Sequence, residues 1–187
     1  MRTTSNIIDP ALPFVDARNA LTQVLEQVHQ LLSSLSQSQY VSSPVGPVHS
    51  AISSHVRHTI DHVQAWLAAT ETETIDYEHR ERGTVVERER DVAIATIRAL
   101  IDAIKSVALD DALQPWAMRA QVTENGSFIA LETTPLREII YVLSHTIHHN
   151  ALIGVMARVH GAALPNGFGH APATLTYNST TAQTCAH

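Results

Sequence analysis

Apolar residues recur at intervals of three and four positions in four long stretches of the chain, the spacing of side chains on one face of an α-helix. Segments that contain proline and glycine, such as Pro44-Val45-Gly46-Pro47, interrupt the pattern. The fourth stretch opens with Thr134-Pro135, a helix cap followed by a first-turn proline. The pattern predicts helices over about 10–35, 48–69, 86–107 and 135–159. Apolar side chains surround the last helix almost completely, so we expect it to be the most buried.

The period of the pattern changes between the third and fourth predicted helices. Two short runs, 117–122 and 127–131, flank Asn125-Gly126, a dipeptide that favours the tight turn of a β-hairpin. The residues after Gly161 predict an extended tail with an ordered first half. We therefore predict a single all-α domain over residues 1–187. Its expected architecture is an antiparallel up-down four-helix bundle with a short β-hairpin before the last long helix and an extended C-terminal tail.

The composition narrows the functional classes. The 187 residues are 44% hydrophobic and 16% charged, with a net charge of −6, as in an ordinary globular protein. The chain has no basic stripe for phosphate groups, which argues against nucleic acid and membranes as partners. The single cysteine cannot form an internal disulfide, and neither a secretion signal nor an apolar run long enough to span a bilayer is recognisable. The expected location is the cytoplasm.

Histidines are concentrated in two of the predicted helices. In the last helix, His145 and His149 are four positions apart and therefore lie on one helical face. The second helix carries His55, His58 and His62 along one flank of its apolar stripe. If these helices pack together, one histidine of the second helix completes a three-imidazole site with the pair. Three protein nitrogens with an open position are typical of a catalytic metal.

Further elements accompany the histidine pair. They are His-x-x-Asp-His at 58–62, Asp-Tyr at 76–77, Arg-x-Arg at 80–82, Ser-His-Thr-x-His-His at 144–149 and Phe-Gly-x-Ala-Pro-x-Thr-Leu at 168–175. Over roughly residues 15–177 the chain thus resembles the DinB/YfiT-like superfamily of metalloenzymes. The resemblance implies a divalent metal, zinc or nickel most often and iron as a further option. Aligning the second helix by its serine-rich start implies the ligands His58, His145 and His149, with His62 and His55 as alternatives to His58.

Other side chains near the expected site are candidates for supporting roles. His62 and His148 are candidates for catalytic residues. The candidates for orienting a ligand imidazole or contacting the substrate are His55, Asp61, Tyr77 and Arg80. Two of these have simpler interpretations, because Asp61 follows Arg57 by four positions, as in an ordinary helix ion pair, and Arg80 fits a solvated loop.

A metal held by three neutral imidazoles acidifies water or activates a thiol. The sequence therefore predicts a metal-dependent hydrolase or thiol-dependent transferase that acts on a small molecule. The alternative is a non-catalytic metal-binding or dimeric scaffold. Apolar residues beyond one stripe in the first and third helices, such as Ile94 beside Ile97 and Ile101, predict a homodimer.

Overall fold

The computed structural model describes residues 11–43, 50–78 and 83–184. Four long helices and three short ones lie within these ranges. The long helices are α1 (Ala11–Ser34), α3 (Ile52–Thr72), α5 (Arg90–Ser106) and α6 (Pro135–Val159), and the short ones are α2 (Gln37–Val41), α4 (Val85–Arg88) and α7 (Pro172–Thr184). The predicted four-helix bundle is thereby confirmed. None of the described helices combines the length and apolar composition that a membrane-spanning helix requires.

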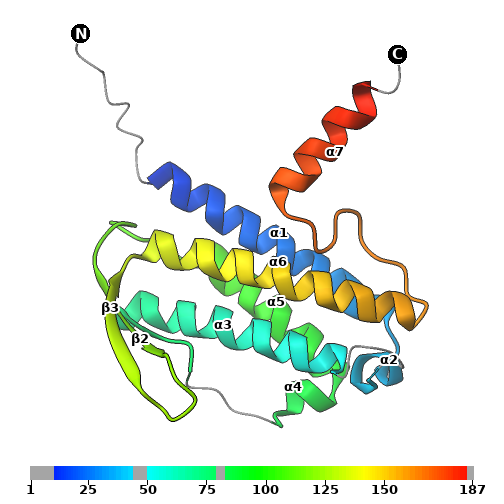
Figure 1. The fold of residues 1–187 in the computed structure, drawn as a ribbon, viewed down its shortest axis with the longest axis horizontal. Coiled ribbons are helices and arrows are strands. Elements are labelled where there is room, and N and C mark those ends of the chain that lie inside the picture. The colour runs from blue at the N-terminus through cyan, green and yellow to red at the C-terminus, as the bar shows by residue number, and fades with distance from the viewer. Residues whose placement is uncertain (1–10, 44–49, 79–82, 185–187) are drawn as a thin grey trace.

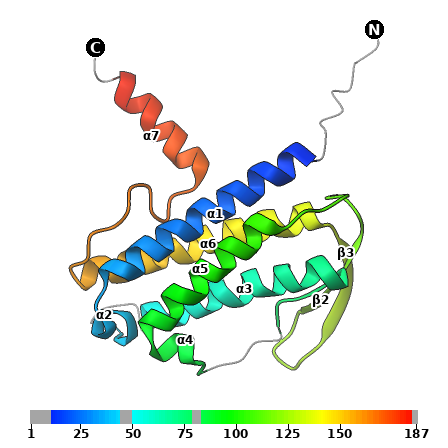
Figure 2. The same cartoon turned by 180° about the vertical axis from the view of Figure 1, so that it is seen from behind.

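Each long helix packs against two of the others. Helix α1 contacts α5 and α6, and α3 contacts the same two helices, so that α1 and α3 lie across the bundle from each other. Both views show α1 and α6 running in one direction and α3 and α5 in the opposite one (Figures 1 and 2). The strict up-down alternation expected from the sequence therefore breaks between α3 and α5. Helix α3 ends beside the sheet and is followed there by β1. Helix α4 lies at the opposite end of the bundle, where α3 begins, and it leads into α5, so α5 runs in the same direction as α3.

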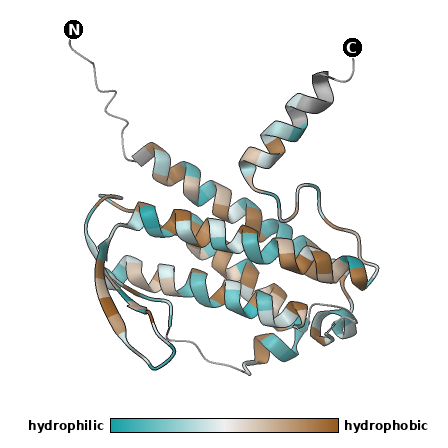
Figure 3. Cartoon of the chain, in the orientation of Figure 1, coloured by the Kyte–Doolittle hydropathy of each residue, from teal (hydrophilic) through white to brown (hydrophobic). Residues whose placement is uncertain are grey.

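The apolar stripes predicted from the sequence form the core. Leu21 and Leu25 of α1, Val63 of α3, and Ile97 and Ile101 of α5 are completely buried. Two tryptophans, Trp66 and Trp116, close the core at the end that carries the sheet. Hydrophilic residues occupy the middle of α3 and of α6, where a continuous apolar seam would otherwise be expected (Figure 3).

The small sheet contains the predicted hairpin and one additional strand. Strands β2 (Trp116–Gln121) and β3 (Phe128–Thr133) pair antiparallel, with Trp116 opposite Thr133. Gly126 adopts φ 86° in the connecting turn, as the Asn-Gly signal predicts. The additional strand, β1 (Thr74–Asp76), pairs parallel with β2 and was not predicted, because three residues are too short to show a period of two.

The predicted third helix is divided at Glu89, whose backbone is extended at φ −125° and ψ 109°. Contacts with α2 replace the helical hydrogen bonds that are lost at this break. The Gln37 side chain donates to the Arg88 carbonyl and accepts from the Arg90 amide at 2.9 Å. The break between α4 and α5 is therefore stabilised by a tertiary contact, which the spacing of apolar residues in the sequence does not reveal.

The last long helix and the tail both differ from the prediction. Helix α6 is not enclosed on all sides, because Ile140, Val155 and Val159 are exposed along one face. The tail is irregular only to residue 171 and then forms α7, which projects from the bundle (Figure 1). Pro172 fits the first turn of this helix. The ordered first half of the tail is confirmed, since Phe168 is buried and packs beside Gly154 of α6.

Candidate metal centre

The histidines of α3 and α6 meet where these two antiparallel helices pack. His55, His58 and His62 are three and four positions apart, so successive turns of α3 present them to α6. His145 and His149 occupy successive turns of α6. The packing of the two histidine-bearing helices, expected from the sequence, is present.

Three of these imidazoles converge most closely. Nε2 of His145 lies 2.9 Å from Nε2 of His58, and one ring nitrogen from each of His58, His62 and His145 lies within 4.8 Å of the other two. The Nδ1 atom of His62 is 3.0 Å from the backbone carbonyl of His58. Because a carbonyl oxygen only accepts, Nδ1 carries the proton and Nε2 keeps a lone pair for a metal. His62 is buried, and the other two are partly buried.

His149 borders the same cluster but contacts a different partner. Its ring centroid lies 4.6 Å from those of His58 and His145. Its Nδ1 atom lies 2.9 Å from Nδ1 of His55, and Nε2 of His55 lies 2.7 Å from the hydroxyl of Ser50. Five imidazoles therefore form one continuous cluster, in which the sequence-derived pair His145 and His149 is present.

Two tyrosines cover the cluster at the end nearer the sheet. Tyr77 stacks on His62 with ring centroids 5.0 Å apart, and Tyr141 stacks on His145 at 5.6 Å. The Tyr77 hydroxyl donates to Oε2 of Glu138 at 2.7 Å. Of the predicted supporting residues, Tyr77 therefore lies directly against the cluster.

Glu138 is completely buried, and no sequence pattern identified it. Its Oε1 atom accepts hydrogen bonds from the Thr133 hydroxyl and from Nη1 of Arg137, the latter at 2.6 Å. These contacts join β3, α6 and the segment after β1 beside the histidines. The sequence does show an acidic residue within the strongly apolar run of α6. A carboxylate buried there requires hydrogen-bond donors, so this position could have been recognised as the centre of a polar network.

Burial and neighbouring positive charge both oppose protonation of the outer histidines. Burial, and then the nearby His145 imidazole, lower the pKa of His149 to about 3. Burial, followed by the field of His148, also lowers the pKa of His55. Burial and the hydrogen bond to Glu138 raise the pKa of the Tyr77 hydroxyl far above its ordinary value, so Tyr77 acts as a donor. His55 and His149 are thus neutral near pH 7, the form in which imidazole binds metals.

The remaining predicted residues lie farther out. His148 is exposed, and its ring centroid lies 5.4 Å from that of His149, at the rim of the cluster. Asp61 forms an ion pair with Arg57, as its spacing of four positions predicts. Arg57 also pairs with Glu87 at 2.8 Å. Arg80 lies outside the described residues, so the structure does not place it.

The donor set is suited to a divalent transition metal. Imidazole nitrogens are common ligands of zinc, nickel and iron, whereas magnesium and calcium prefer oxygen. His58, His62 and His145 supply three such nitrogens from two rigid helices. In the metal-free protein one N–H bridges the Nε2 atoms of His58 and His145, and a bound cation would replace this hydrogen bond and take a lone pair from each ring.

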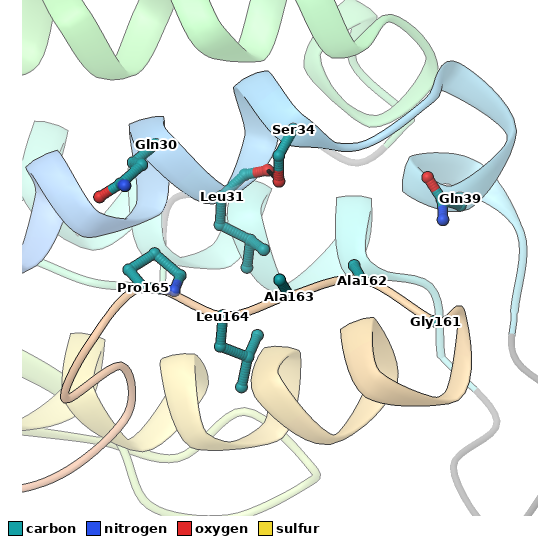
Figure 4. A pocket seen from close by; sticks show the side chains of 9 residues that line it. All are labelled: Gln30, Leu31, Ser34, Gln39, Gly161, Ala162, Ala163, Leu164 and Pro165. Carbon is teal, nitrogen blue, oxygen red and sulfur yellow. Dashed lines mark hydrogen bonds between the residues drawn. The ribbon is translucent and has the colours of Figure 1, made fainter.

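Two cavities of a size that suits a small molecule lie near the ends of α6. One of about 430 Å³ lies beyond the C-terminal end of α6, between α1, α2 and the segment from Gly161 to Pro165 (Figure 4). It is lined by Gln30, Ser34 and Gln39 together with small apolar residues, and no histidine of the cluster borders it. The other, of about 500 Å³, is not lined by a cluster histidine either, but it is bordered by Tyr141, which stacks on His145.

The architecture defines a four-helix-bundle protein with a metal-type histidine cluster between two helices. Residues 20–153 match the sequence model of the DinB superfamily, and the chain belongs to this superfamily. A comparison with curated protein sequences finds no significant match.

Solved structures share the fold at low sequence identity. A DinB-like protein from Bacillus cereus has a TM-score of 0.58 and 16% identity, over 82% of this chain and 94% of that one. The DinB-like protein YjoA from Bacillus subtilis has a TM-score of 0.58 and 12% identity, over 80% of this chain and 96% of that one. YfiT from Bacillus subtilis has a TM-score of 0.58 and 14% identity, over 87% of this chain and 95% of that one. YfiT is described as a probable metal-dependent hydrolase with an unusual four-helix bundle topology. At these identities the similarity establishes the fold.

Proposed function

We propose that this protein is a divalent-metal-dependent hydrolase that acts on a small molecule. The observation that carries the proposal is the convergence of three imidazoles from α3 and α6, with their nitrogens within 4.8 Å of one another. Three protein ligands leave coordination positions for water and substrate. The description of YfiT as a probable metal-dependent hydrolase supports the same reaction class.

In this proposal, His58 and His145 are ligands, and the third ligand is His62 or His149. The geometry favours His62, whose Nδ1 atom is anchored on a backbone carbonyl. The sequence resemblance favours His149, whose Nδ1 atom is held by His55. Zinc or nickel is the expected ion, with iron as a further option. When bound, such an ion lowers the pKa of water and polarises a substrate oxygen.

The surrounding residues have distinct roles in the proposed reaction. Tyr77, fixed by Glu138, keeps the His62 ring in place and excludes water from that side. The contacts from His149 through His55 to Ser50 form a path for a proton between the cluster and the partly exposed Ser50 hydroxyl. His148, at the rim, is placed to contact a bound substrate.

The proposal is tested by measuring metal-dependent turnover. Wild-type protein is stripped with a chelator, reloaded with zinc, nickel or iron(II), and assayed with activated carboxyl and phosphate esters. We expect hydrolysis only after reloading, and loss of it in His58→Ala and His145→Ala but not in the α1 variant His29→Ala. Turnover that requires a low-molecular-weight thiol would replace the hydrolase by a transferase. Tight metal binding without turnover in either assay would favour the non-catalytic scaffold.

We also propose a homodimer and a cytoplasmic location. The third-helix residues that suggested the dimer do not support it, because Ile97 and Ile101 are buried in the core. Its support comes instead from apolar side chains that remain exposed on α1 and α6, among them Leu12, Val15, Val155 and Val159. Light scattering at micromolar concentration tests it, since a single chain has a mass of 20.4 kDa. Such a mass would reject the dimer.

A further inference from the structure

An open cavity of about 500 Å³ lies on the solvent side of α6, next to the histidine cluster. Leu113, Leu136 and Ile140 are the aliphatic residues that line it. Leu113 is 51% exposed and Ile140 is 47% exposed, so large apolar side chains face solvent at this point of the molecule. Concave apolar surfaces of this size are typical of small-molecule sites.

Tyr141 connects this cavity to the proposed metal centre. It lines the cavity, and its ring stacks on His145 with an interplanar angle of 22°. Ser144, the residue immediately before His145, also lines the cavity. No histidine of the cluster lines the cavity, so a molecule bound there would contact the Tyr141 ring that stacks on His145.

Arg137 places a positive charge on the wall of the cavity, one helical turn before Tyr141. Its Nη1 atom donates to the buried Glu138, and its guanidinium carbon lies 5.2 Å from the centre of the Tyr141 ring. The side chain is nevertheless 56% exposed, so donors on Nε and Nη2 remain accessible to a ligand. Glu138 also accepts hydrogen bonds from Tyr77 and Thr133, which fixes it as a support for the guanidinium.

We propose that this cavity is the substrate site of the metal centre and that the substrate is a small, largely apolar molecule with a carboxylate or similar planar anionic group. The guanidinium fork of Arg137 binds the anionic group, and Leu113, Leu136 and Ile140 cover the apolar part. This inference rests on the proposed function, because it assigns the substrate class of that centre.

The helix sets the length of such a ligand. Seven positions separate Arg137 from Ser144, which corresponds to roughly 10 Å along an α-helix. This length is an upper limit, because the Arg137 guanidinium carbon lies only 5.2 Å from the centre of the Tyr141 ring, which stacks on His145. A bicyclic aromatic carboxylate has approximately this length, whereas acetate is too short.

The experiment uses 2-naphthoate as the anionic probe and 2-naphthalenemethanol as its uncharged counterpart. Fluorescence titration measures their binding to the full chain, both stripped of metal and loaded with zinc. We expect naphthoate to bind both forms and to bind at least about tenfold more tightly than the alcohol. Arg137→Gln should abolish this preference, Arg137→Lys should retain part of it, and Ile140→Ser should weaken both ligands.

Arg98→Gln is the matched control, because Arg98 is a comparably exposed arginine, at 59%, that pairs with Asp102 on α5. It should bind naphthoate like the wild type. Circular dichroism and metal content show whether each variant is folded. If Arg137→Gln does not fold, Arg137→Lys and Ile140→Ser test the ligand site in its place. Unchanged naphthoate binding in Arg137→Gln, equal binding of acid and alcohol, or no saturation at about millimolar ligand would overturn the proposal.

The metal-free arm separates this inference from the proposed function. Naphthoate binding that disappears on metal removal would mean that its carboxylate binds the ion, and would overturn the role of Arg137. If His58→Ala and His145→Ala lose the metal but still bind naphthoate, the residues that bind the ligand are separate from those that bind the metal, as proposed. Failure of metal-dependent turnover with intact naphthoate binding would overturn the proposed function and the cavity's assignment to a metal centre, while leaving the ligand class in place.

Discussion

Nε2 of His58 lies 2.9 Å from Nε2 of His145, although 87 positions separate the two residues in the chain. The contact connects two turns of antiparallel helices, whose backbones hold the two residues opposite each other. His62 and His149 lie on either side of this pair as candidates for a third ligand.

The first prediction concerns the choice of the third ligand. Because one ring nitrogen of His62 already lies within 4.8 Å of a nitrogen of each of the other two rings, His62→Ala should lower the zinc affinity about as strongly as His58→Ala. His149→Ala should have a smaller effect if its role is limited to the contact with His55. Competition with a chromogenic chelator measures each affinity, and His29→Ala serves as the control on α1. A larger loss in His149→Ala than in His62→Ala would instead establish the ligand set His58, His145 and His149.

Local signals predicted much of this molecule. The apolar stripes identified the four long helices, and Asn125-Gly126 identified the hairpin turn, because Gly126 supplies the positive φ that the turn needs. The histidine spacing indicated which faces of α3 and α6 meet. These features depend on neighbours within one or two turns, which a single sequence records.

Other features depend on contacts between distant segments and could not be predicted. The break at Glu89 is stabilised by Gln37, which lies on a different helix. The donors to Glu138 include Tyr77 and Thr133 from two other segments. The close approach of His62 rather than His149 to the central pair depends on side-chain rotation, for which helical spacing alone leaves both options open.

The second prediction concerns acid stability of the metal-free protein. The pKa of His149 is about 3 in the folded state, against an ordinary value of about 6.5 in an unfolded chain. At a pH between about 3 and 6.5, His149 is protonated in the unfolded state but not in the folded state. The free energy of unfolding therefore decreases as the pH falls from about 6.5 toward 3. His149→Gln should lose less stability over this range, although His55, whose pKa is also lowered, keeps part of the dependence.

Urea denaturation of chelator-treated protein at several pH values in this window measures the difference. Metal must be absent, because protons and metal compete for the same nitrogens. Parallel pH dependence in the wild type and His149→Gln would show that this imidazole is not held neutral by its surroundings.

The third prediction concerns the buried carboxylate. Glu138→Ala should lower the free energy of unfolding by about 3–5 kcal/mol, because it leaves Tyr77 and Thr133 without their acceptor and creates a cavity. Glu138→Gln keeps the shape and should cost about 1–3 kcal/mol. Glu26→Gln is the control, since Glu26 is half-exposed and pairs with Lys105 at 3.0 Å, and should change stability by less than about 1 kcal/mol. Similar losses for Glu138→Gln and Glu26→Gln would mean that burial of Glu138 has little energetic consequence.

The last prediction concerns the attachment of the tail to α6. Gly169 has φ +73°, and a Cβ atom on it would lie 2.7 Å from both Cα and N of Ala151. Backbone atoms of a helix cannot move aside as a flexible side chain can, so Gly169→Ala must displace the tail. The displacement withdraws Phe168, which is 4% exposed and packs beside Gly154.

Gly161→Ala is the matched control for this variant, because Gly161 has a similar φ of +75° but no atom within 4 Å of the place that an added methyl group would occupy. It should cost only the backbone strain, about 1 kcal/mol, whereas Gly169→Ala should cost at least about 2 kcal/mol. Hydrogen exchange should show lost protection at residues 166–170 in Gly169→Ala alone, because the amides of Phe168 and His170 donate within that turn. Equal destabilisation in both variants, with protection retained, would show that positive φ rather than the contact with Ala151 selects glycine at position 169.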